Sequence, residues 1–205
     1  EPILRLRLGQ DISCQTLEYG TVVHMNGVQI SLHPAGHIPG SAQVRLEYKG
    51  EVWVVSGDYK LAVDGISSPF EPVKCHTFIT ESTFGLPIYR FPEPKQVHKA
   101  INEWWAANRA EGYNSIICAY ALGKAQRVLA HLDASIGPIY THGAVDNINT
   151  LLAPAIPLPE TRRIDKDVNR KNIKGALIVA PPSATEGPWT RSMGPYRLGI
   201  CSGWM

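Results

Sequence analysis

The hydrophobic period of the sequence changes near residue 94, and this change constrains the fold more than any other feature of the chain. Before it, apolar and polar residues alternate over short runs, which is the period of β-strands. After it, segments with a helical period alternate with short apolar runs, which is the pattern of a parallel sheet covered by helices. With 205 residues and 44% apolar content, the chain can bury a core. The sequence predicts an α/β protein of one large or two small domains, with a mostly β first part and a β-α second part.

The first part is expected to be a meander of strands over residues 13–57. Asn26-Gly27 and Lys49-Gly50 each stand between apolar runs, which is the strongest short signal for a β-hairpin. The run EVWVVSG is apolar almost throughout, which predicts a strand covered on both faces. The run HTFITEST predicts a further short strand that ends at Glu81.

The second part predicts β-α alternation. The run QVHKAINEWWAANRA places Val97, Ile101, Trp104 and Trp105 on one helical stripe. After it we expect, in order, the strand SIICAY, the helix ALGKAQRVLAHL, the strand PIYTHG, the helix NINTLLAP and the strand GALIVAPPS. The proline-rich and charged residues 154–175 are predicted to form an exposed excursion before the last of these strands. The alternation is typical of a parallel, Rossmann-like sheet.

Composition excludes several classes of protein. No apolar run reaches 18 residues, which excludes a transmembrane helix, and the first residues lack the layout of a secretory signal. The four cysteines form no C-x-x-C pair, so we expect reduced, buried thiols of a cytoplasmic protein: Cys14, Cys75, Cys118 and Cys201. Because the chain opens at Glu1 and ends in an apolar run, we expect it to be an internal fragment of a longer protein.

The net charge of +2 is unevenly distributed. Residues 1–85 carry 6 Lys plus Arg against 9 Asp plus Glu, a net of −3, whereas residues 86–205 carry 14 against 9, a net of +5. The second part is therefore the one that would attract a polyanion. A solvated basic face is the alternative interpretation.

His37 and Asp58 are the first candidates for chemistry. His37 lies between two glycines in the loop AGHIPGSAQ, and Asp58 follows the run EVWVVSG. Both side chains would stand at strand ends, and an imidazole with a carboxylate suits zinc or manganese. The alternative is that each residue only caps its own turn.

Further candidates lie at the end of the next strand and in the second part. Glu81 either caps Ser82 or Thr83 or orients a metal-ligating histidine from outside the ligand shell. Gly123-Lys124 opens a helix directly after a strand, an arrangement that receives phosphate, although it lacks a Walker frame. His33 lies four residues before His37, but Pro34 and Gly36 prevent the helix that would bring the two together, so His33 is expected to face the sheet. The remaining histidines have no ligand spacing and are expected to be structural, with His142 the least secure: His24, His76, His98, His131 and His142.

Four motifs together carry a resemblance to a known family. AGHIPGSA, VVSGDYK, TESTFG and YALGKAQR, in this order, resemble the metallo-β-lactamase-fold nucleases of the β-CASP group, and the likeness is closest to the bacterial ligase-associated DNA exonucleases. It extends over essentially the whole chain. The resemblance implies that residues 1–85 are part of an αββα metallo-β-lactamase sandwich and that residues 86–205 are most of a Rossmann-like β-CASP insert.

The resemblance also implies a mechanism. His37 would be a zinc ligand, Asp58 would bridge two Zn²⁺ ions (Mn²⁺ is the alternative), and Glu81 would be the first acidic motif of the insert. Two metals about 3.5 to 4 Å apart would activate water for phosphodiester hydrolysis. The candidates for contacts with the substrate are Lys60, Ser82, Gly123 and Lys124. The family's H-x-H-x-D-H motif and its later histidines are absent from the sequence, so the fragment alone is expected to be inactive.

The implied partners are DNA, with RNA not excluded, and an ATP-dependent DNA ligase, and the implied role is exonuclease activity in cytoplasmic DNA repair. Two alternatives from other classes stay open. One is a catalytically inactive β-CASP scaffold or nucleic-acid-binding subunit. The other is a hydrolase of small esters, against which the second basic part argues.

Overall fold

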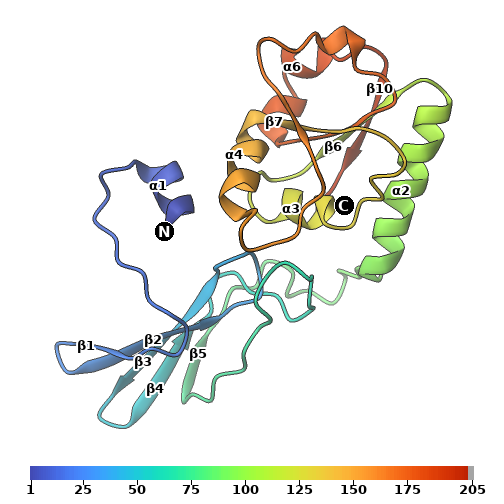
Figure 1. Cartoon of the computed structure of the whole chain (residues 1–205). Helices are drawn as coiled ribbons and strands as arrows, with labels where there is room; N and C mark the ends of the chain where they lie inside the picture. The colour runs from blue at the N-terminus through green and yellow to red at the C-terminus, as the bar shows by residue number, and fades with distance from the viewer. Residues whose placement is uncertain (203–205) are drawn as a thin grey trace. The chain divides into compact units, whose positions relative to one another are not determined.

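The computed structural model describes residues 1–202 (Figure 1). The chain forms two compact units, Glu1–Tyr89 and Arg90–Met205. In the described part of each unit, one five-stranded sheet forms the frame. The boundary between the units falls in the proline-bearing segment that precedes the first long helix of the second unit.

The first unit has its strands in sequence order. Strands β1 to β4 pair antiparallel, and β5 pairs parallel to β4. Its elements are α1 (Pro2–Leu8), β1 (Val23–Met25), β2 (Val28–Pro34), β3 (Ala42–Tyr48), β4 (Glu51–Val55) and β5 (Thr77–Ile79).

Both predicted hairpins are confirmed. Asn26 and Gly27 join β1 to β2 with φ of 52° and 82°, and Lys49 and Gly50 join β3 to β4 with φ of 50° and 82°. Two consecutive residues with positive φ make the turn whose twist matches that of the flanking strands, and Asn and Gly adopt this conformation at the lowest cost.

Two expectations for the first unit are wrong. Residues 13–22 contain no strand, and α1 was not predicted. Strand β4 is not covered on both faces in the described structure: Val52 and Val54 are buried, whereas Trp53 between them is 43% exposed. An unbroken apolar run shows that both faces of a strand are apolar, but it does not show that both are covered.

The second unit confirms the predicted parallel sheet. Its strand order is β10-β6-β9-β7-β8, and every neighbouring pair is parallel. Its elements are α2 (Pro94–Ala110), β6 (Asn114–Cys118), α3 (Lys124–Leu129), β7 (Ile139–His142), α4 (Gly143–Leu152), β8 (Arg162–Ile164), the 3-10 turn η1 (Arg170–Asn172), β9 (Leu177–Ala180), α5 (Pro182–Thr185), α6 (Pro188–Arg191) and β10 (Tyr196–Ile200).

The expected excursion over residues 154–175 is only partly correct. Within it, Arg162, Arg163 and Ile164 form the edge strand β8, which pairs with β7. Three residues with one apolar side chain carry too little periodicity to predict a strand. Helix α4 also begins earlier than predicted, directly after His142.

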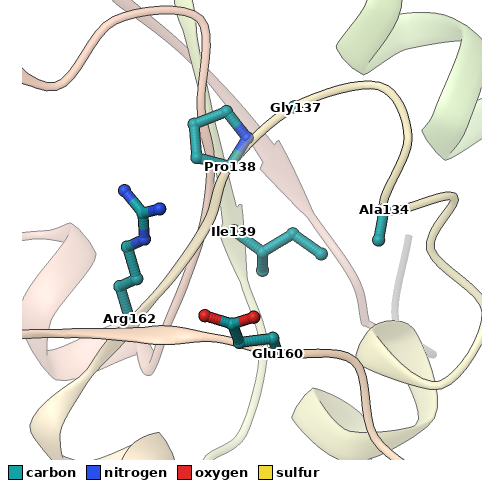
Figure 2. Close-up of a pocket in the computed structure, with 6 residues that line it drawn as sticks. All are labelled: Ala134, Gly137, Pro138, Ile139, Glu160 and Arg162. Carbon is teal, nitrogen blue, oxygen red and sulfur yellow. The ribbon is translucent and has the colours of Figure 1, made fainter.

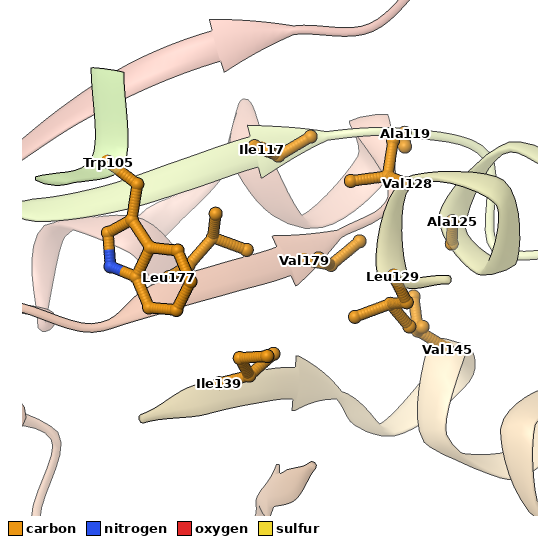
Figure 3. Close-up of a cluster of buried hydrophobic side chains, with 10 residues drawn as sticks. All are labelled: Trp105, Ile117, Ala119, Ala125, Val128, Leu129, Ile139, Val145, Leu177 and Val179. Carbon is orange, nitrogen blue, oxygen red and sulfur yellow. The ribbon is translucent and has the colours of Figure 1, made fainter. Parts of the chain in front are cut away.

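A cluster of buried apolar side chains joins α2, α3 and α4 to one face of this sheet (Figure 3). In this view Trp105 lies beside the first half of the strands, and Val128, Leu129 and Val145 lie toward the arrowheads. Trp105 is fully buried, and its indole N–H donates to the carbonyl of Gly175 at 3.2 Å. The predicted stripe of α2 is thus anchored by a residue that satisfies its one polar atom. This core fixes the positions at which the strands end.

The prediction that the cysteines are buried is wrong for three of the four. All four cysteines are unpaired, but only Cys118 is buried. In the described residues, no helix is long and apolar enough to cross a membrane.

Candidate active site

Asp58 and Glu81 follow two neighbouring parallel strands of the first unit. Strand β4 ends at Val55 and β5 ends at Ile79, and these two residues are register partners. The N–H of Ser56 still donates to the carbonyl of Ile79 at 2.9 Å. The chain therefore leaves both strands at the same edge of the sheet, the edge at which α/β proteins place ligands.

Gly36 brings the loop of His37 to this edge. Its φ is +72°, and a Cβ at this position would lie 2.2 Å from the carbonyl oxygen of Lys60. The N–H of Lys60 in turn donates to the carbonyl of Ala35 at 2.9 Å. Only glycine combines this backbone conformation with so close an approach. The loop that carries His37 is thereby fixed to the segment that follows Asp58.

Ser41 folds the loop itself. Its hydroxyl oxygen accepts from the N–H groups of His37 and Ile38 at 3.1 and 3.2 Å, and its carbonyl accepts from the N–H of Ala35 at 3.1 Å. Behind the loop, the side-chain amide of the buried Gln43 donates to the carbonyl of Pro34 at 2.9 Å. The satisfied backbone groups explain why a glycine-rich loop can hold a fixed position for His37.

Two of the three candidate side chains meet at this edge, and the third follows the neighbouring strand. The Nε2 of His37 lies 3.7 Å from Oδ2 of Asp58, and the two side chains are 39% and 70% exposed. The carboxylate of Glu81 accepts from the N–H of Thr83 at 2.6 Å. This hydrogen bond lowers the pKa of Glu81, and the charge of His37 lowers it further. The Thr83 contact is the capping role considered for Glu81, and the effect of His37 on its pKa is a smaller, through-space one.

Lys60 and Ser82 belong to the same edge. Lys60 is two residues beyond Asp58 and half-buried, and Ser82 directly follows Glu81 and is exposed. The ammonium of Lys60 and the hydroxyl of Ser82 are thus each close in sequence to one of the two carboxylates.

The candidate metal ligands are of suitable chemistry but do not complete a site. A catalytic zinc takes three protein ligands, and His37 with Asp58 supplies two donors. Among residues 1–202, no group of three or more His, Cys, Asp or Glu side chains has an arrangement that could hold a metal ion. A metal centre at this edge needs donors beyond those that the described residues bring together.

Gly123 and Lys124 lie in the second unit, after strand β6. Gly123 has a φ of +85°, and its N–H donates to Oε1 of Gln126 at 2.7 Å. This N–H is therefore used inside the protein. Lys124 places its ammonium 5.2 Å from the ring centroid of Tyr120, which is 58% exposed. Burial lowers the pKa of Lys124, and Arg127 adds to the effect.

The sequence did not reveal two polar arrangements near the carboxyl edge of the second sheet. Gln126 also donates to Oδ1 of Asn149 at 2.8 Å, which ties α3 to α4, adjacent helices in Figure 1. The Nδ1 of His142 accepts from the N–H of Ala144 at 3.1 Å and so caps α4. The second could have been predicted from the position of His142 between a strand and a helix, because capping side chains occupy that position.

A pocket of about 180 Å³ lies elsewhere in the second unit (Figure 2). It includes Ile139 and Arg162, the first residues of β7 and β8, and Glu160 faces it with a carboxylate. The pocket therefore opens at the amino ends of the parallel strands. Ligands of such sheets bind at the carboxyl ends, so it does not belong to the candidate site.

Known proteins similar to this chain include some whose names describe enzymes that act on nucleic acids. The chain is 29% identical, over 98% of its length, to a protein of Opitutus terrae named probable DNA ligase. Over 58% of its length it is 29% identical to endoribonuclease YSH1 of Saccharomyces cerevisiae, and equally to cleavage and polyadenylation specificity factor subunit 3 of Dictyostelium discoideum. The chain spans 20% of the ligase-named protein and 15% of each of the other two. No protein-family model matches the chain.

Proposed function

We propose that this chain is part of a metal-dependent nuclease of the metallo-β-lactamase β-CASP group that hydrolyses phosphodiester bonds. The observation that carries the proposal is that His37 lies 3.7 Å from Asp58 at the carboxyl edge of β4 and β5, the edge at which Glu81 also leaves its strand. The similarity to endoribonuclease YSH1 supports it, because the four motifs quoted from the sequence resemble the same group of nucleases.

Each residue has a proposed role. His37 and Asp58 are donors to a centre of two zinc ions, or manganese as the alternative, because imidazole and carboxylate suit both metals. Glu81, which leaves β5 at the same edge, would help to orient a metal-binding histidine, as carboxylates near metal sites do. Lys60 and Lys124 offset the charge of the substrate phosphates, and Ser82 and Gly123 are the remaining candidates for substrate contacts.

DNA is the proposed substrate, with RNA as the alternative. The similarity to the ligase-named protein covers nearly the whole chain, whereas the similarity to the endoribonuclease covers 58% of it. Because that ligase-named protein contains a stretch like this chain within a longer sequence, we propose an ATP-dependent DNA ligase as the partner. We also propose exonuclease activity in cytoplasmic DNA repair, which rests on the resemblance of the four motifs to those of the ligase-associated DNA exonucleases.

A catalytically inactive nucleic-acid-binding subunit is the second candidate. The incomplete set of metal donors among the described residues favours it. The two candidates differ in whether the intact protein cleaves what it binds.

The test is cleavage of end-labelled DNA and RNA by the intact protein in the presence of zinc or manganese. The nuclease proposal predicts metal-dependent release of label, lost on addition of a chelator. Binding without cleavage under all metal conditions would favour the inactive subunit. The 205-residue chain on its own is expected to bind zinc weakly, since affinity collapses when the fold does not gather enough ligands.

A further inference from the structure

Cationic and aromatic side chains gather in the second unit around the carboxyl ends of β7 and β8, at residues to which no role has been assigned above beyond helix capping. We call these residues the His142 cluster: His142, Arg163, Arg170 and Trp189. They come from β7, β8, η1 and α6, which are separated by up to 47 positions in the sequence. In Figure 1, β7, α4 and α6 lie together in one region of this unit.

His142 and Arg170 both contact Trp189. The imidazole meets the indole edge to face, with ring centroids 5.0 Å apart, and the guanidinium carbon of Arg170 lies 5.5 Å from the ring centroid. The Nη1 of Arg170 also donates to the hydroxyl of Ser192 at 3.2 Å. An arginine held against an aromatic ring is ordered in advance, so it loses little entropy when it binds a ligand.

Arg163 lies at the amino end of helix α4. Its Nη1 donates to Oδ2 of Asp146 at 3.2 Å and to Oδ1 of Asn147 at 2.6 Å. Its Nη2 lies so close to Gly143 that a Cβ there would be 3.0 Å away. The amino end of this ten-residue helix carries a partial positive charge, and Asp146 in its first turn is the carboxylate that offsets both this charge and the guanidinium of Arg163.

The pKa of His142 is also affected by the positive charge around it. Burial lowers the pKa of His142, and both Arg170 and Arg163 lower it further. Because Nδ1 accepts the N–H of Ala144, the neutral ring carries its proton on Nε2. Asp146 forms its ion pair with Arg163, and among residues 1–202 no acidic side chain forms an ion pair with Arg170.

We propose that the His142 cluster binds a phosphate group of a nucleic-acid strand. The guanidinium groups of Arg163 and Arg170 and the amino end of α4 are donors suited to phosphate oxygens. The cluster stands at the carboxyl edge of the sheet, and the adjoining residues 160–174 carry 6 Lys plus Arg against 3 Asp plus Glu. The inference rests on the proposed function only in that the substrate is a nucleic acid.

The experiment measures binding of the intact protein to a 3′-labelled single-stranded oligonucleotide in a chelating buffer, so that cleavage plays no part. The test variant is Arg163→Gln with Arg170→Gln. The control variant is Lys95→Gln with Lys99→Gln, which removes the same charge from the exposed face of α2 in the same unit. We expect the test variant to bind about tenfold more weakly, the size of a lost charge-assisted hydrogen bond. Its salt slope should fall by about one to two units. The control should stay within about twofold of the original protein.

A second variant is expected to bind the oligonucleotide more tightly, so that its effect cannot be attributed to misfolding. Asp146→Asn removes the acid that competes for Arg163 but keeps an oxygen that can accept from it. We expect binding to become about threefold tighter, which a damaged fold would not produce. Unchanged or weaker binding of this variant would count against the proposal.

Further arms identify the ligand. Tighter binding of a 5′-phosphorylated strand, lost in the test variant, would assign the cluster to a terminal phosphate; equal binding with or without that group would assign it to a backbone phosphate.

The proposal is overturned if the test and control variants bind alike, if the protein does not bind the oligonucleotide at all, or if an acidic peptide competes as well as inorganic phosphate does. Cleavage that persists while the variants bind alike would refute this inference alone, and absence of cleavage with the expected losses in binding would refute only the proposed nuclease.

Discussion

The carboxyl edge of β4 and β5 in the first unit and the carboxyl edge of the parallel sheet in the second unit differ in charge and in construction. In the first unit, loops clamped by Gly36 and Ser41 bring a histidine and two carboxylates together, and residues 1–85 carry a net charge of −3. In the second unit, arginines and a helix end gather at the edge, and residues 86–205 carry +5. An acidic edge suits cations and an activated water, whereas a basic edge suits phosphate. The difference fits our proposal that the first unit carries the chemistry and the second holds the strand.

The largest expected effect is on the acidic edge. His37→Ala and Asp58→Ala should each reduce cleavage by the intact protein more than about 100-fold, because loss of a direct ligand exceeds the 10 to 100-fold effect of its supporting partners. The measurement is the initial rate of release of a DNA end label, with circular dichroism as the check on folding. Near-normal cleavage by either variant would remove that residue from the site.

Gly36→Ala tests whether the loop geometry builds this edge. The new Cβ would lie 2.2 Å from a backbone oxygen at a φ of +72°, so we expect a loss of about 3 kcal/mol in the free energy of unfolding of the first unit. Gly40→Ala is the matched control in the same loop, since Gly40 has a φ of +80° but no atom within 4 Å of its added Cβ. It should cost about 1 kcal/mol from backbone strain alone. Equal losses in urea denaturation would show that the contact with Lys60 is not tight.

Glu81→Gln should have a smaller effect on the rate. The amide cannot hold His37 by charge, although it can still accept the N–H of Thr83. We expect cleavage to fall on the order of 10 to 100-fold with the stability of the first unit nearly unchanged. A loss of stability without a loss of rate would assign Glu81 to local capping only.

Lys124→Ala should have the smallest effect and only on binding. Nucleic acids of different sequence should lose affinity about equally, and the salt slope should fall by about one unit. A loss confined to one sequence would mean that Lys124 contacts a base.

The two sheets also differ in what the sequence predicted. The parallel sheet of the second unit follows from the period of α2 and the apolar runs of β6 and β9, because burial on both faces leaves a strong signal. The hairpins follow from Asn26-Gly27 and Lys49-Gly50. The exposed face of Trp53 and the strand β8 were missed, because covering and pairing depend on residues distant in sequence.

The sites differ in the same way. His37, Asp58 and Glu81 were selected as residues at strand ends, and the register of β4 with β5 brings the two acids to one edge. The His142 cluster was not found, because its members come from four elements with no shared motif. Only the fold places Arg163 beside Gly143 and Arg170 over Trp189.

The most direct test of the account compares two acids of the same strand region. Asp58 lies beyond the carboxyl end of β4, and Glu51 is the first residue of β4, at the opposite end. The measurement is metal-dependent cleavage of DNA by the intact protein carrying Asp58→Asn or Glu51→Gln. We predict loss of cleavage for Asp58→Asn and a normal rate for Glu51→Gln. Normal cleavage by Asp58→Asn would contradict the claim that the carboxyl edge of β4 and β5 carries the chemistry.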